Sequence, residues 1–248
     1  MKKGILFGLL LMMICGDIIA QQIYTEQPPV LIKNEGEGGI ILHSQGFGFN
    51  YRRAKMLNVN TKRFWDFDFE TVLHPKEVST VNPDIPNAKS YVYGKMNDAY
   101  FLRAGIGKEK IMYDREEKKG IQIRYNYSGG FSFAITKPIY FDIVAPDNVA
   151  GDTLVKFDPS NPLDPTTIIG RASFFTGLGE MQIQPGLYYK MGVSFMQVNQ
   201  SNNFYVLETG FAIDGFRNPV PIMANTPNNR FFLTFYLNLM IGKRWNNY

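Results

Sequence analysis

Few side chains of this sequence are of the types that commonly act as nucleophiles, general bases or metal ligands. The chain has two histidines, His43 and His74, and a single cysteine, Cys15. Ser44 follows His43, but neighbouring side chains on a strand point to opposite faces, so this pair cannot work as a nucleophile and its base. Thiolate and imidazole ligands are too few for a soft-metal site. We therefore expect no catalytic residue, no metal ion and no cofactor.

Three acidic residues, Asp66, Asp68 and Glu70, occupy alternate positions. Carboxylate oxygens are the ligands that Ca²⁺ takes in proteins. A calcium loop makes its ligands converge, whereas alternate positions on a strand spread them along a line. The spacing therefore favours a charged strand face over a calcium site.

A short polar motif, His-Pro-Lys-Glu at 74–77, stands where a predicted strand meets a long loop. His74, Lys76 and Glu77 are candidate residues for binding a partner or an anion. The alternative is a structural role, in which the motif ends the strand and begins the loop.

The elements that must carry these residues show a period of two. In 120–136, apolar and aromatic residues from Ile121 to Ile135 alternate with small or polar ones such as Gln122 and Arg124. The same alternation recurs along the chain, which predicts strands rather than helices. The predicted strands are 39–53, 62–73, 99–112, 120–136, 186–198, 204–215 and 230–243.

The number and spacing of these strands predict an all-β fold, a closed antiparallel transmembrane barrel. Single-chain bacterial barrels normally have an even number of strands, so we expect about eight. The additional strand would come from 22–38, from a division of 39–53, or from 137–145. Short connections alternate with long, proline-rich ones, as expected for short periplasmic turns and long extracellular loops. The short connections are 54–61, 113–119 and 199–203, and the long ones are 74–98, 137–185 and 216–229.

The apolar strand faces must contact either a second sheet or lipid. The opposite faces are mainly Gly, Ser, Ala, Asn and Thr, which suits the crowded interior of a narrow barrel better than a water-exposed sandwich face. The runs also reach the ~9–11 residues that a tilted strand needs to cross a bilayer. A soluble secreted β protein is the alternative. The residues expected to face lipid include Ile121, Ile123, Tyr125, Phe131, Phe133, Phe231, Leu233, Phe235, Leu237 and Leu239.

Charged residues recur on the polar faces. Inside a narrow barrel they must pair, because lone buried charges are costly. They could line a selectivity or proton path, or they could form an internal ion-pair network that fixes the strand register. We favour the structural network, whose expected members are Asp66, Asp68, Glu70, Arg103, Arg124, Lys190, Glu208 and Asp214.

The N-terminal residues predict export. Two lysines precede an apolar run from Gly4 to Ile14 that is too short to span a bilayer as a helix. Cleavage after Ala20 predicts a signal peptide over 1–20 and a single barrel domain over 21–248. Lipidation at Cys15 is the alternative, although the residues just before it are large. The net charge of only +4 gives no reason to expect nucleic-acid binding.

Motifs spread over nearly the whole chain resemble those of one bacterial group: HPKE at 74–77, YVYGK at 91–95, LRAGIG at 102–107, TKPIYFDIV at 136–144, FDPSNP at 157–162, IIGRASFFTGLGE at 168–180, PGLYYKMGVSF at 185–195 and FFLTFYLNLMIGKR at 231–244. The chain resembles small outer-membrane β-barrel proteins of the Bacteroidetes. This resemblance implies an outer-membrane location and a barrel, but no activity and no binding residues. The last strand, ending near Trp245, also resembles the C-terminal signal that barrel-assembly machinery recognises.

The function that these observations favour is that of a structural or accessory, partner-binding subunit of an outer-membrane assembly, without catalysis. Its partners would be outer-membrane lipid and other outer-membrane or periplasmic proteins. The loop over 137–185 is the main binding candidate, because loops of this length on a rigid scaffold commonly carry function. Two alternatives stay open. One is a small pore, and the other is a membrane-embedded hydrolase of lipid or lipopolysaccharide that would use His43 or His74.

Overall fold

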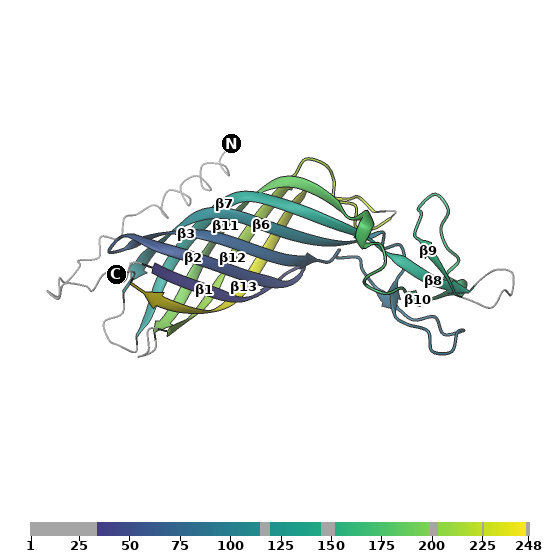
Figure 1. Cartoon of the computed structure of the whole chain (residues 1–248), viewed down its shortest axis with the longest axis horizontal. Helices are drawn as coiled ribbons and strands as arrows, with labels where there is room; N and C mark the ends of the chain where they lie inside the picture. The colour runs from purple at the N-terminus through teal and green to yellow at the C-terminus, as the bar shows by residue number, and fades with distance from the viewer. Residues whose placement is uncertain (1–33, 115–119, 145–151, 199–202, 225, 247–248) are drawn as a thin grey trace, which may run out of the picture. The chain divides into compact units, whose positions relative to one another are not determined.

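Eight long strands form a closed antiparallel barrel in the computed structural model (Figure 1). The structure describes residues 34–114, 120–144, 152–198, 203–224 and 226–246. The predicted signal peptide over 1–20, with Cys15, lies outside these residues. The barrel strands are β1 (Asn34–His43), β2 (Gly46–Asn58), β3 (Thr61–Val72), β6 (Asn97–Tyr113), β7 (Ile121–Pro138), β11 (Gln182–Val198), β12 (Asn203–Phe216) and β13 (Phe231–Trp245).

Each barrel strand pairs with the barrel strands before and after it, and β1 pairs with β13 to close the sheet. The closing register runs from Asn34 opposite Trp245 to His43 opposite Tyr236. This up-and-down order leaves no free sheet edge in the barrel. The expectation of eight antiparallel strands is confirmed. No helix among the described residues is long and apolar enough to cross a membrane.

The prediction of a single strand over 39–53 was wrong. The structure divides this segment and begins the additional strand, β1, at Asn34, so two of the alternatives, the division of 39–53 and the segment 22–38, each contribute half of β1. The segment is part of the hairpin of β1 and β2, which turns at Ser44 and Gln45. Gly46 follows the turn with a φ of +154°, and a Cβ there would lie 2.2 Å from the carbonyl oxygen of Thr71. A glycine at this position therefore permits both the backbone conformation and the close approach of β3. Apolar alternation continues through the turn, which is why the sequence pattern hid it.

The connections differ between the two ends of the barrel. At one end, here called the turn end, β1 begins, β13 ends, and short connections join β2 to β3, β6 to β7 and β11 to β12. At the other, the loop end, a two-residue turn joins β1 to β2, while long segments follow β3, β7 and β12. The predicted alternation of short and long connections is therefore confirmed.

The long segments at the loop end have secondary structure of their own. Strands β8 (Tyr140–Val144), β9 (Asp152–Lys156) and β10 (Ile168–Arg171) form a sheet in the order β10-β8-β9. The segment 137–145, one possible source of an eighth strand, thus contributes the end of β7 and β8, and β8 lies outside the barrel sheet. A second small sheet pairs β4 (Ser79–Thr80) with β5 (Tyr91–Val92). The 3₁₀ turns η2 (Pro165–Thr167) and η3 (Leu178–Glu180) complete the loops.

The loop elements enclose a small hydrophobic core, which makes them a folded platform. Its buried members come from three different connections: Tyr91, Ile139, Phe141, Phe157, Ile168 and Ala224. Backbone hydrogen bonds join the three connections to one another, for example Ile139 N to Met96 O at 2.9 Å and Met96 N to Ile222 O at 2.9 Å, and the bond from Phe216 N to Arg230 O at 2.9 Å joins them to β12. We call the segments 73–96, 139–181 and 217–230 together the loop platform.

Glycines let neighbouring strands of the wall approach where the lumen is crowded. Gly130 of β7 is paired with Gly105 of β6. A Cβ on Gly130 would lie 2.3 Å from the carbonyl oxygen of Ala104 and 2.5 Å from the Cα of Gly105. Both obstacles are backbone atoms of an adjacent strand, so neither can move without distorting the ladder.

We expect Gly130→Ala to lower the free energy of unfolding by about 1–3 kcal/mol, the usual cost of overpacking. Urea unfolding in detergent micelles, followed by the gel shift between folded and heat-denatured barrel, measures this free energy. The matched control is Gly179→Ala, because a Cβ on Gly179 would meet nothing within 4 Å. The control should change the free energy by less than about 0.5 kcal/mol. Equal effects of the two substitutions would contradict the packing argument.

Candidate functional site

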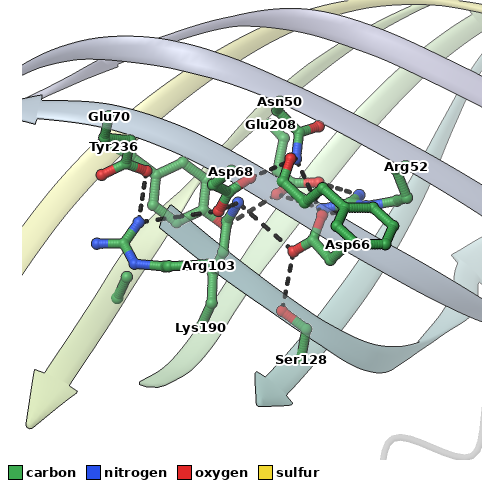
Figure 2. A network of polar contacts seen from close by, with 12 residues as sticks. Asn50, Arg52, Asp66, Asp68, Glu70, Arg103, Ser128, Lys190, Glu208 and Tyr236 are labelled. Carbon is green, nitrogen blue, oxygen red and sulfur yellow. Dashed lines mark hydrogen bonds and ion pairs between the residues drawn. The ribbon is translucent and has the colours of Figure 1, made fainter. Parts of the chain in front are cut away.

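The inside of the barrel is polar and charged, and the outside is apolar. All eight charged residues proposed for the lumen point inward, and none is more than 2% exposed. The structure brings them together in layers of ion pairs, the central part of which is drawn in Figure 2. These layers lie between a cluster of further ion pairs toward the turn end and an aromatic cluster toward the loop end.

Arg103 of β6 forms the first layer. Its Nε and Nη2 donate to the two carboxylate oxygens of Asp214 at 2.8 and 2.7 Å, and its Nη1 donates to Glu70 Oε1 at 2.5 Å. The Ser132 hydroxyl donates to Asp214 Oδ1 at 2.7 Å. This guanidinium thus connects β6 with β3 and, across the lumen, with β12. A two-point contact of this kind fixes both distance and orientation.

Arg52 of β2 forms the second layer, together with Glu208 and Lys190 (Figure 2). Arg52 Nη1 donates to Glu208 Oε2 at 2.7 Å, and its Nε lies 3.3 Å from Asp66 Oδ1. The Tyr236 hydroxyl donates to Glu208 Oε1 at 2.9 Å. Lys190 Nζ lies 2.9 Å from Asp68 Oδ2 and 3.7 Å from Asp66 Oδ2. Each carboxylate of this layer therefore has a cation within ion-pair distance.

A third group lies nearer the turn end. Arg124 Nη1 donates to Glu109 Oε1 at 2.7 Å, and Lys62 Nζ lies 3.3 Å from the same oxygen. Lys62 also pairs with Glu35, whose other carboxylate oxygen accepts from Arg244 Nε at 2.6 Å. Arg124 therefore belongs to a different cluster from the other seven residues proposed for the lumen.

Sequence reasoning missed four members of the network, Glu35, Arg52, Lys62 and Glu109, and also the buried lumen residue Glu37. The signal for three of them was present, because Arg52, Lys62 and Glu109 have the parity of the polar residues in their own strands. Glu35 and Glu37 lie in β1, whose start was not recognised because the hairpin of β1 and β2 was read as one strand.

Aromatic side chains fill the lumen at the loop end. The Phe101 ring lies 4.8 Å from the Phe216 ring and 5.0 Å from the Phe232 ring, measured between centroids. Val220 and Ile222 of the loop platform pack in the same cluster and are at most 2% exposed. This aromatic cap and the ion-pair layers below it leave the interior occupied by side chains, as expected for a barrel of eight strands.

His43 lies at the end of β1, where its Nε2 is 3.5 Å from Glu70 Oε2, so its imidazole borders the ion-pair network. Among the described residues, no group of three or more His, Cys, Asp and Glu side chains is arranged to hold a metal ion.

The motif at 74–77 forms a compact turn after β3. Glu77 accepts a hydrogen bond from the backbone N–H of His74 at 2.8 Å, and His74 Nδ1 accepts one from the backbone N–H of Lys76 at 3.2 Å. The other carboxylate oxygen of Glu77 lies 2.6 Å from Lys95 Nζ. His74 and Glu77 are thus used within the turn, while the Lys76 side chain is exposed.

A cavity of about 560 Å³ lies in the loop platform. Phe157, Asp158 and Glu180 line it, together with prolines of three segments. The Tyr140 hydroxyl donates to Glu180, and Lys156 Nζ lies 2.9 Å from its other carboxylate oxygen; these contacts hold the pKa of Glu180 below its ordinary value. Lys156 also lines the cavity, so its wall combines a Lys156–Glu180 ion pair and Asp158 with apolar side chains, which is a chemistry suited to binding.

The side chains expected to face lipid all point away from the lumen. Phe131 is 63% exposed, Phe231 is 74% exposed and Phe235 is 61% exposed. Ile123, Tyr125 and Phe133 are half-buried between their neighbours on the same face. Ile121, Leu233, Leu237 and Leu239 are exposed. The resulting outer surface is a continuous apolar belt around the barrel wall.

The sequence matches no family model and no curated protein. Among solved structures, Neisserial surface protein A (NspA) shares 11% identity over 86% of this chain and 96% of its own, with a TM-score of 0.38. Ail, the attachment invasion locus protein of Yersinia pestis, shares 10% identity over 86% of this chain and 99% of its own, with a TM-score of 0.39. Ail in complex with the heparin analogue sucrose octasulfate shares 12% identity over 86% and 96% of the two chains, with a TM-score of 0.36. The closed barrel of this chain is established by its own strand pairing.

We expect Arg103→Met to lower the free energy of unfolding by about 3–5 kcal/mol, because it leaves Glu70 and Asp214 as buried carboxylates without their main partner. Urea unfolding in micelles provides the measurement. Adding Glu70→Gln and Asp214→Asn to the Arg103→Met protein should restore part of the loss, since the buried charges are then removed together. Arg217→Met, at an exposed loop position, is the control and should cost less than about 0.5 kcal/mol. A loss of similar size at both arginines would show that the network does not stabilise the barrel.

Proposed function

We propose that this protein is an outer-membrane β-barrel of a Gram-negative bacterium that presents the loop platform to a protein partner, as a structural or accessory subunit and without catalysis. The proposal includes a signal peptide over 1–20 and a mature domain over 21–248. The lineage suggested by the sequence motifs, the Bacteroidetes, is part of the same proposal. The observation that carries it is the contrast between a lumen occupied by side chains and loops that have their own folded core.

The apolar belt supports a membrane location. Large side chains such as Phe131, Phe231 and Phe235 are largely exposed on a wall in which every strand is paired with a neighbour on both sides. Exposing such a surface to water is unfavourable, whereas hydrocarbon accommodates it. A closed sheet also satisfies the requirement that no backbone polar group be left unpaired in lipid.

The aromatic cap and the ion-pair layers argue against the alternative of a pore. A conducting path needs a continuous aqueous lumen, which small barrels filled by side chains lack. The alternative of a hydrolase has no support in the geometry around the two histidines, because His43 borders Glu70 and His74 is used in a turn. Binding at the loops is therefore the favoured function, and the cavity beside Glu180 is one place for it.

We expect the purified protein to produce no discrete current steps in a planar lipid bilayer, because the lumen is occupied. Arg124→Gln and Glu208→Gln should leave the bilayer equally silent. A porin reconstituted in the same bilayers serves as the positive control. Current steps whose size changes on neutralising either residue would instead establish the pore function.

Partner binding is tested by replacing 139–181 with a short Gly-Ser linker in the tagged protein, expressed in its native outer membrane. We expect a specific protein to be retained with the wild type and lost with the linker variant, since the variant lacks most of the loop platform. The control replaces the turn at 59–60, at the opposite end, with Asn-Gly. The heat-dependent gel shift shows that each variant still forms a barrel. A wild-type protein that is always recovered alone would contradict the proposal.

A further inference from the structure

Charges of opposite sign are segregated between the two faces of the barrel wall. Every acidic side chain on the eight barrel strands is buried; Glu35, Glu109 and Asp214 are examples. Every exposed charged side chain on the same strands is a lysine or an arginine. These exposed cations are Arg53, Lys55, Arg63, Lys108, Lys110 and Lys243.

The six cations form one sector of the wall at the turn end, here called the basic sector. They come from β13, β2, β3 and β6, which together with β1 are consecutive in the closed sheet. Lys55 is directly opposite Arg63, and Arg63 is directly opposite Lys108. Gly36 of β1 is directly opposite Arg53 on one side and Lys243 on the other, so it separates these two cations. The outer positions of β7 and β12 at this height are instead uncharged, for example Tyr125 and Tyr205.

This arrangement is unfavourable by itself, since like charges directly opposite one another in an antiparallel ladder repel. Among the described residues, none of the six makes an ion pair with a carboxylate. The Arg53 guanidinium lies over the Trp245 ring, 5.9 Å from its centroid. Space for this ring comes from Gly36, where a Cβ would lie 3.0 Å from the indole. Among the residues that the structure describes, the sector therefore has no anion that would offset its repulsion.

We propose that the basic sector binds the phosphate headgroups of anionic phospholipids in the leaflet at the turn end of the barrel. This inference rests on the proposed membrane function. Its first support is continuity with the apolar belt. Going along the wall toward the turn end, an exposed apolar residue is the neighbour of the cation on the same strand face. The pairs are Trp65 with Arg63, Ile106 with Lys108 and Ile241 with Lys243.

The second support is chemical. Lysine and arginine chains lie along apolar surface and extend their charged ends to the headgroup level, and tryptophan and tyrosine are enriched at the same level. A phosphate brought between Lys55, Arg63 and Lys108 would accept hydrogen bonds from adjacent strands and remove their mutual repulsion. Because the sector covers only part of the circumference, the bound lipids would occupy one side of the barrel.

The test compares the wild type with the triple variant Lys55→Gln, Arg63→Gln, Lys108→Gln. Both are inserted into vesicles of phosphatidylcholine, with or without phosphatidylglycerol, and lipids that remain bound after detergent extraction are identified by native mass spectrometry. At about fivefold per basic residue near an anionic surface, these three residues together should give the wild type a preference for phosphatidylglycerol over phosphatidylcholine of roughly 100-fold, and the variant should lose that part of the preference. The matched control, Lys89→Gln, Arg217→Gln, Arg230→Gln, removes three exposed cations of the loop platform and should keep the preference.

The unfolding temperature in each kind of vesicle provides a second test, which does not depend on how much lipid the protein retains after detergent extraction. In phosphatidylcholine alone, the triple variant should unfold at the same temperature as the wild type or higher, because repulsion is relieved. In vesicles with phosphatidylglycerol the order should reverse. Inorganic phosphate added to the protein in neutral micelles should not reproduce the stabilisation, because the proposed ligand is a lipid.

The outcomes separate this inference from the proposed function. If the wild type inserts into vesicles but shows no preference for phosphatidylglycerol, or if the triple variant keeps the preference, the basic sector is not a lipid site and the barrel proposal stands. Stabilisation by free phosphate equal to that by phosphatidylglycerol would likewise overturn it. If the wild type inserts into neither kind of vesicle, the membrane function itself is wrong and this inference is lost with it.

Discussion

The hydrogen-bonded pairing of β1 with β13 is the contact on which the rest of the structure depends, because it closes the sheet. Once closed, the wall has no unpaired backbone edge and can be surrounded by hydrocarbon. Closure with eight strands also sets the width of the interior, which is just enough to be filled by side chains. Every inward residue must therefore fit, and every inward charge must have a partner.

Ion pairs meet this requirement for most inward charges, and they also hold the wall together across the lumen. Glu37 is the exception among the described residues, because it is buried and its Oε2 has no hydrogen-bond partner. Arg103 connects β6 to β12, and Arg52 connects β2 to β12, in addition to the ladder contacts between neighbouring strands. A shift of one residue in any strand would turn its charges into the lipid and its aromatic rings into the lumen. The network therefore specifies register as well as stability.

The two faces of the wall place charge in opposite ways. Inside, carboxylates and cations are mixed. On the outer face of the barrel strands, the exposed charged side chains are all lysines and arginines, and they lie at the turn end. The loop platform at the other end has its own core around Phe141 and Phe157. The barrel thus separates an apolar wall from a loop platform with its own folded core.

The sequence by itself determined which side of the wall each residue occupies, since side chains alternate strictly along a strand. It thereby predicted the barrel, the outward position of residues such as Phe131 and the inward position of residues such as Asp66. It could not show that 39–53 contains a hairpin, because the alternation continues through the turn before Gly46. Only the tertiary structure decided that Arg103 meets Asp214, that Phe101 joins the aromatic cap and that Lys55, Arg63 and Lys108 adjoin. Alternation sets the face of a strand but not its register with strands distant in the chain, and register decides which side chains meet.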